Sequence, residues 1–297
     1  MPRGTGGVTP YALLVAPFAD YDFMRRALLG CLALAMGCGP IGVLLVLRRM
    51  SLMGDALSHA LLPGAGVGFV VAGLSLTAMS IGGFVAGLAV ALLAGLVTRV
   101  TPLREDASFA AFYLTSLALG VLLVSLHGSN VDLLHVLFGS VLAVDDHALL
   151  LIGTITSVTL LALALVYRPL LVECFDPLFL RTHGGGGTLY HLVFLVLVVL
   201  NLVAAFQALG TLMAVGLMMV PAAAARFWGR EVWTLALTSI LIAFASSCLG
   251  LLASFHLDLP SGPAIVLTAS GFYLLSILVG PRGGVLPRRV RARHLEA

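Results

Sequence analysis

Long apolar segments are the feature that most constrains the fold of this chain. A helix needs about 20 residues to cross the hydrocarbon core of a bilayer, and the sequence holds a series of apolar segments of about that length. They lie at residues 27–47, 52–73, 77–97, 108–126, 147–166, 190–208, 209–225, 232–254 and 264–280. Because lipid offers the backbone no hydrogen-bond partner, such segments must be helical. We therefore predict an all-α fold: a polytopic transmembrane helical bundle with eight or nine spans, the count depending on the boundary near residue 209.

The composition supports a membrane protein and excludes one class of enzyme. Charged residues make up only 10% of the 297 residues, whereas a soluble domain carries about a quarter. All 16 basic residues are arginine. A P-loop needs the lysine of G-x-x-x-x-G-K-[ST] to reach the nucleotide phosphates, so this chain is predicted not to be an ATPase itself. We expect a single transmembrane domain over residues 1–297.

The arginines also predict which side of the membrane each loop faces. If all nine segments span, three arginines fall on one side, before residue 27, and the other thirteen on the opposite side. Cytoplasmic loops carry the excess of basic residues. This places the loop 167–190 and the basic tail 281–297 in the cytoplasm, with residues 1–26 as an extracytoplasmic or interfacial lead-in. The tail suits anionic lipid headgroups, and nucleic-acid binding is not expected.

One ionisable pair stands between apolar stretches, in the run RRMSLMGDALSHALLPG. Asp55 and His59 are four residues apart, so in a helix they share one face. Ionisable residues within membrane segments are costly and mark ion or proton paths. A carboxylate oxygen and an imidazole nitrogen suit Zn, Mn or Fe. Two ligands do not close a metal site, so a second copy of the chain is expected to supply more. The simpler alternative is that the two side chains only satisfy each other.

Two prolines lie inside predicted spans and predict breaks or hinges. Pro63 follows His59 by one turn and has no N–H, which leaves the His59 carbonyl without its helical partner. Pro221 lies in GTLMAVGLMMVPAAAARFWG, where a hinge and an ordinary kink are equally consistent with the sequence.

Five stretches of the sequence resemble, in order and spacing, the ABC-3 family of permease subunits of zinc, manganese and iron importers (ZnuB-like). They are LRRMSLMGDALSHALLPG (47–64), VDLLHVLFGSVLAV (131–144), FDPLFLRTHG (175–184), LGTLMAVGLMMVPAAAAR (209–226) and LPSGPAIVL (259–267). The resemblance implies a permease in the prokaryotic cytoplasmic (inner) membrane that works as a dimer with a second copy or a close paralogue. It also implies separate cytoplasmic ABC ATPase subunits and an extracytoplasmic metal-binding protein. No tightly bound cofactor is implied, only a transported divalent metal ion.

The resemblance also suggests residue roles. Asp55 and His59 take the positions of the pair that lines the metal route. Phe175, Asp176 and Pro177 fall in the segment that couples the permease to the ATPase. In this chain Leu178 and Phe179 follow, where the family usually has Glu and Ala.

Other features leave alternatives open. Several His and Asp residues fall on the predicted external side, and His135, within the apolar stretch DLLHVLFG, is the best further candidate for metal entry. His183, His191 and His294 lie near the cytoplasmic side and are not metal candidates. A proton-coupled secondary metal transporter that uses Asp55 and His59 as a relay is the main alternative function. A membrane metalloenzyme is the least favoured, because a third ligand and an H-E-x-x-H motif are missing.

Overall fold

The structure is a computed structural model, and it describes residues 10–73, 75–103, 105–126, 144–176 and 187–287. The described residues are helical apart from short turns and connections. Two short helices, α1 (Pro10–Leu14) and α2 (Ala16–Asp20), precede the long ones. The long helices are α3 (Asp22–Leu47), α4 (Ser51–Ala72), α5 (Leu76–Val100), α6 (Glu105–Leu126), α8 (Asp146–Phe175), α10 (Gly187–Leu209), α11 (Thr211–Ala225), α12 (Val232–Leu257) and α13 (Ser261–Val279).

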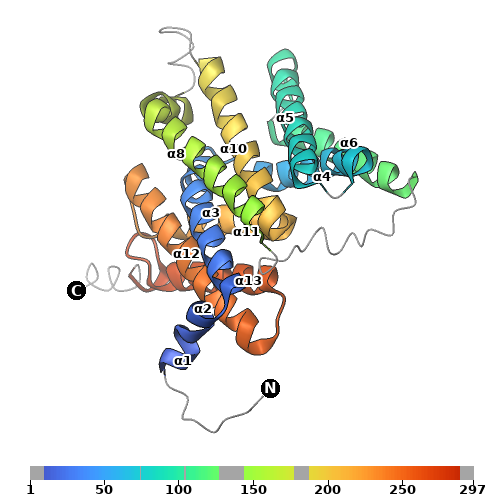
Figure 1. Cartoon of the computed structure of the whole chain (residues 1–297). Coiled ribbons are helices and arrows are strands. Elements are labelled where there is room, and N and C mark those ends of the chain that lie inside the picture. The colour runs from blue at the N-terminus through green and yellow to red at the C-terminus, as the bar shows by residue number, and fades with distance from the viewer. Residues whose placement is uncertain (1–9, 74, 104, 127–143, 177–186, 288–297) are drawn as a thin grey trace, which may run out of the picture.

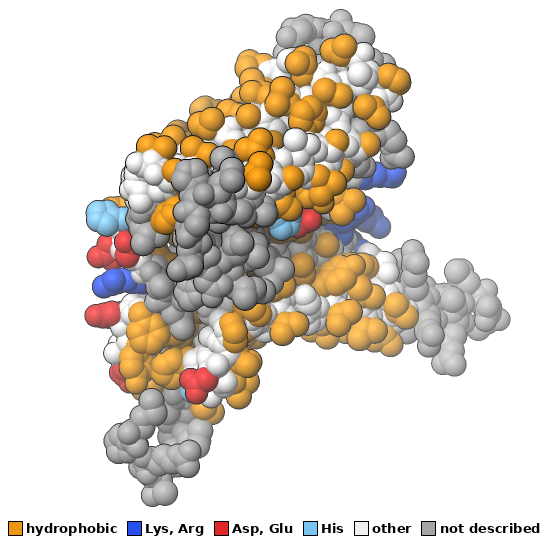
Figure 2. All heavy atoms as spheres, turned by 90° about the vertical axis from the view of Figure 1, so that its right-hand side faces the viewer, with side chains coloured by type: hydrophobic (Ala, Val, Ile, Leu, Met, Phe, Trp, Pro, Cys, Tyr) orange, Lys and Arg blue, Asp and Glu red, His pale blue; other side chains and the backbone are white. Residues whose placement is uncertain are grey.

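The predicted helical bundle is confirmed, and each predicted apolar segment lies largely within one long helix. Among the described residues, seven helices are long and apolar enough to cross a membrane, and two shorter apolar stretches lie within α6 and α11. The chain is thus a multi-pass membrane protein. Among the described side chains on the face in Figure 2, hydrophobic ones predominate, and charged ones gather in a few places.

Helices extend into two of the segments predicted to flank the spans. Within the loop expected over 167–190, α8 continues to Phe175 and α10 begins at Gly187, and the cytoplasmic location of this loop stays a prediction. The lead-in expected over 1–26 also contains the first turn of α3, which begins at Asp22. In both places a polar or charged residue ends the apolar run, whereas the backbone continues its helical hydrogen bonds.

The helices pack as two groups (Figure 1). α4 packs mainly on α5 and α6, whereas α3 packs on α8, α11 and α12. α4 and α5 cross with backbones almost in contact: a Cβ added at Gly64 would lie 2.0 Å from the carbonyl oxygen of Gly82. Only glycine permits this approach, which is a common way to pack helices in lipid.

Neutral hydrogen bonds join α3, α8 and α10 near their middle. The fully buried Asn201 amide on α10 donates to Thr159 Oγ1 on α8 at 2.8 Å, and Thr156 on α8 donates to the Ala33 carbonyl on α3 at 3.0 Å. Such bonds satisfy polar groups that lipid cannot.

The backbone departs from a regular helix at positions other than the two predicted prolines. α4 continues through Pro63, and α11 continues through Pro221. The boundary near residue 209 is set by Gly210, whose φ of 80° ends α10 and begins α11. α8 has a non-helical residue at Val166 (φ −110°, ψ 18°). Pro169 follows three residues later, and proline rings disturb the turn before them. Hinge motion at Pro63 or Pro221 stays a prediction.

Candidate metal site

The turn before α4 places Asp55 one turn and His59 two turns into that helix. α3 ends in a Schellman motif, in which the Met50 N–H donates to the Leu45 carbonyl at 2.9 Å and Arg49 takes a φ of 60°. α4 starts at Ser51, directly after this turn. The connection between α3 and α4 is therefore short and fixed.

Asp55 and His59 face each other along α4. Asp55 Oδ1 lies 3.7 Å from His59 Nε2, and the side chains are 57% and 31% exposed. His59 Nδ1 is buried and has no hydrogen-bond partner among the described residues. The His59 ring stacks on Tyr113 of α6 at 6.2 Å between centroids. α6 thus orients the imidazole, and the carboxylate remains open to the surface of the chain.

The pair has the chemistry and nearly the spacing of two ligands to one metal ion. Metal–ligand distances of about 2.1 Å place neighbouring ligand atoms about 3.0–3.5 Å apart. The separation between Asp55 and His59 therefore needs only a small side-chain shift to bind one ion. Within the described ranges no group of three or more His, Cys, Asp or Glu side chains is placed to hold a metal. Among the described residues, the pair by itself therefore supplies two candidate ligands and no closed metal site.

α6 also supports the stretch of α4 that follows the pair. The Ser116 hydroxyl donates to the Ala60 carbonyl at 3.4 Å. A Cβ added at Gly120 would lie 3.0 Å from Pro63, so α6 lies close against the proline. Asp55 and His59 are therefore carried by a helix that α5 and α6 hold on two sides.

The structure describes some of the other predicted site residues and not others. Phe175 ends α8 with its side chain 65% exposed, and Asp176 follows as the C-cap of that helix. Pro177 and His135 lie outside the described residues, as does most of the four-glycine run at 184–187. The structure therefore brings Asp55 and His59 together and leaves the coupling segment and the metal entry as predictions.

On the predicted external side, two acidic residues have structural partners. The Asp145 carboxylate accepts a hydrogen bond from the Ala148 N–H at 2.8 Å and so caps α8. Asp146 lies 3.4 Å from Arg26 Nε. His256 Nε2 lies 3.0 Å from the Leu13 carbonyl oxygen on α1. These contacts join α1, α3, α8 and α12 at one end of the bundle.

The structure reveals a buried charged cluster that the sequence analysis missed. Arg48, at the end of α3, lies with Nη2 3.3 Å from Glu173 Oε1 on α8 and Nη1 3.2 Å from His191 Nδ1 on α10. The side chains of Arg48, Glu173 and His191 are 7%, 5% and 14% exposed. The guanidinium also stacks over Phe194 at 4.5 Å. Because a guanidinium only donates, His191 Nδ1 accepts, which places the proton of a neutral ring on Nε2.

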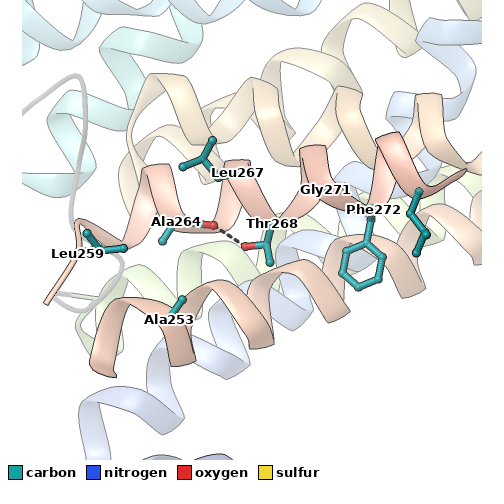
Figure 3. Close-up of a pocket in the computed structure, with 8 residues that line it drawn as sticks. Ala253, Leu259, Ala264, Leu267, Thr268, Gly271 and Phe272 are labelled. Atoms are coloured by element: carbon teal, nitrogen blue, oxygen red, sulfur yellow. Dashed lines mark hydrogen bonds between the residues drawn. The ribbon is translucent and has the colours of Figure 1, made fainter. Parts of the chain in front are cut away.

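An apolar groove of about 510 Å³ lies along α13, beside α12 and the connection between them (Figure 3). Its lining includes Ala253, Leu259 and Phe272 and no charged side chain. The one hydroxyl in the lining, Thr268, donates within its own helix to the Ala264 carbonyl. The groove therefore offers no ligand for a metal ion.

Sequence comparison with known families decides which kind of membrane protein carries this pair. Residues 20–280 match the ABC 3 transport family. The chain belongs to the ABC 3 transport family. The match includes all the long helices, and it confirms the family expected from the five stretches of sequence. It gives no support to the proton-driven alternative.

Individual relatives match over nearly the whole chain. The manganese import system permease protein ScaB of Streptococcus parasanguinis is 34% identical over 91% of this chain and 96% of its own length. A probable iron transport system membrane protein of Haemophilus influenzae is 30% identical over 94% of this chain and 98% of its own. Among solved structures, PsaBC from Streptococcus pneumoniae in complex with Fab superimposes with a TM-score of 0.82 at 31% identity, covering 93% of this chain and 98% of that one. This ABC 3 family member is thus a bacterial-type inner-membrane permease in fold and sequence.

Proposed function

We propose that this chain is the membrane-spanning permease subunit of an ABC importer for a divalent transition metal ion, with manganese or iron as the cargo. The observation that carries the proposal is the Asp55–His59 pair on α4, 3.7 Å apart and open on one side. The family match supplies the transport class, and the names of the relatives favour manganese and iron. Zinc is equally compatible with the donor atoms but has no such support.

The incompleteness of the site suits transport. A cargo ion must bind well enough to enter and weakly enough to leave, as in any ion pathway. One carboxylate and one imidazole from each of two chains would bind a metal, and movement of the two chains apart would release it. We therefore propose that the functional permease is a dimer with the pair from each copy lining a shared path.

The energy source belongs to partner proteins in this proposal. The chain has no lysine and hence no P-loop. Cytoplasmic ABC ATPase subunits would bind at the segment that begins with Phe175 and Asp176, and an extracytoplasmic binding protein would deliver the ion. The arginine-rich loops support this orientation.

Uptake into liposomes tests the proposal. The permease is reconstituted with its ATPase and binding-protein partners, and ATP-dependent uptake of Mn²⁺, Fe²⁺ and Zn²⁺ is compared. We expect Mn²⁺ or Fe²⁺ to accumulate, and both Asp55→Ala and His59→Ala to lower uptake to the level of empty liposomes, because each removes half of the ligands. His256→Ala removes an exposed histidine in the last turn of α12. This variant serves as the control and should transport normally. Normal uptake in both site variants would show that the pair is structural.

A further inference from the structure

We propose that Arg48, Glu173 and His191 form a buried link that passes movement of the coupling segment after α8 to α4, and that Arg48 is thereby a positioning residue for Asp55 and His59. The inference rests on the proposed transport function and adds the route by which energy reaches the metal site.

The first part of the route is the cytoplasmic end of α8. Its helical geometry is interrupted at Val166, so the last two turns can change direction relative to the rest of the helix. Glu173 lies in those turns, two residues before Phe175, where the coupling segment begins. Any displacement of that segment therefore moves Glu173 directly.

The second part is the contact from α8 to α3. Arg48 Nη2 meets Glu173 twice, at Oε1 (3.3 Å) and at the backbone carbonyl (3.4 Å). Contacts to the side chain and the backbone together fix both distance and direction. His191 and Phe194 on α10 hold the guanidinium from the other side. Arg48 therefore follows the end of α8 rather than rotating freely.

The third part is the turn from α3 to α4. Only Arg49 and Met50 separate Arg48 from the first residue of α4, and both are fixed by the Schellman hydrogen bonds. Met50 is itself buried. Asp55 lies one turn further along, so a shift of Arg48 becomes a shift of the metal ligands. α4 packs mainly on α5 and α6 and only lightly on α3. The turn is therefore the main connection between α3 and α4.

A role in stability alone does not account for the cluster. The middle of α3, α8 and α10 is already joined by neutral hydrogen bonds through Asn201 and Thr156. Buried ion pairs add little net stability, because desolvation offsets their attraction. A metal site is also unsuitable here, because the Arg48 charge repels a cation. What the charged cluster adds is a directional contact between three helix ends.

The test separates coupling from folding with a double variant, Arg48→Met/Glu173→Met. Replacing both partners with apolar side chains leaves no unpaired charge, so the fold should persist. We expect the same thermal unfolding midpoint, normal co-purification with the ATPase subunits and continued ATP hydrolysis. Mn²⁺ taken up per ATP hydrolysed should fall about tenfold, within the usual range of coupling free energies. Arg48→Lys, which keeps the charge, should lower the ratio of uptake to hydrolysis less than the double variant does. Arg230→Met, which removes an exposed arginine from the α11–α12 connection, should leave this ratio unchanged.

Two results of the uptake experiment would overturn the link. One is an unchanged ratio of uptake to hydrolysis in the double variant. The other is a parallel loss of hydrolysis and uptake with a lowered unfolding midpoint, which would show a purely structural role.

A distance measurement keeps this test independent of the cargo. Spin labels at Leu52, on the first turn of α4, and at Arg168, on the last turns of α8, occupy exposed positions. In the assembled transporter with the Arg48 cluster intact, ATP should shift both helices together and leave the distance between labels narrow. In the double variant, ATP should broaden or change that distance, and an identical response in both proteins would refute the link. If the wild type carried no metal, the proposed function would fail, while this measurement would still decide the link.

Discussion

The two ends of α3 are each joined to α8 by an ion pair, and the two pairs differ in burial rather than in distance. At the N-terminal ends, Arg26 Nε lies 3.4 Å from Asp146 Oδ1, and the side chains are 44% and 76% exposed. At the C-terminal ends, Arg48 Nη2 lies 3.3 Å from Glu173 Oε1, and the side chains are 7% and 5% exposed. Nearly equal distances thus describe two different interactions.

Exposure to solvent determines how much each ion pair contributes to stability. An exposed pair is screened by water and salt and contributes about 0–1 kcal/mol. Loss of one partner from a buried pair costs about 3–5 kcal/mol, because the remaining charge has no water to solvate it. The exposed pair can form and break with little consequence, whereas the buried one holds a fixed arrangement. This contrast suits the proposed coupling, in which the predicted external end stays adaptable and the predicted cytoplasmic end passes on the movement of the coupling segment.

The largest effect is expected for Glu173→Ala. This variant leaves the Arg48 guanidinium buried without its carboxylate, so the free energy of unfolding should fall by about 3–5 kcal/mol. Denaturation of the purified permease in detergent, followed by tryptophan fluorescence, measures it. The apolar double variant at Arg48 and Glu173 should keep the stability of the wild type, and equal losses in the two variants would show that burial of charge is not the cause.

A smaller effect is expected for His191→Leu. The substitution removes the acceptor for Arg48 Nη1, and a hydrogen bond to a charged group contributes about 1.5–3 kcal/mol. The same denaturation experiment should show a loss between those of the buried and exposed pairs. The exposed Leu189→Ala on the same helix is the control. A loss for His191→Leu no larger than that of the control would remove His191 from the cluster.

The smallest effect is expected for Arg26→Gln at the exposed pair. Its cost should be about 0–1 kcal/mol and should disappear at high salt, because a Debye length of about 3 Å at 1 M screens the attraction. Unfolding measured at low and high salt tests this. A salt-independent cost comparable with that of Glu173→Ala would end the contrast between the two pairs.

The sequence was sufficient to predict most of the fold, since nine apolar segments stand out against few charges and lipid permits little besides helix. It was insufficient for the ends and kinks of helices. α8 extends to Phe175 past the charged Arg168, and its irregular residue is Val166 rather than Pro169 itself. A break at Gly210 depends on a positive φ that glycine permits and that no pattern of hydrophobicity reveals.

The functional residues, too, could be predicted from the sequence only in part. Asp55 and His59 could be paired from the sequence, because their separation by four residues is local and the helix is certain. The Arg48 cluster could not, because Glu173 and His191 are 125 and 143 positions away from it in the chain. Only the packing of α3, α8 and α10 brings them together. The arginine count placed Arg48 only on the predicted cytoplasmic side.

Pulsed electron paramagnetic resonance on Mn²⁺ bound to the purified permease tests the central claim most directly, because it detects a histidine nitrogen bound to the ion. The wild type should show this nitrogen coupling. His59→Ala should lose it, Asp55→Ala should weaken Mn²⁺ binding, and His256→Ala should keep both. A nitrogen signal that survives His59→Ala would place the metal elsewhere and contradict the assignment of Asp55 and His59 as its ligands.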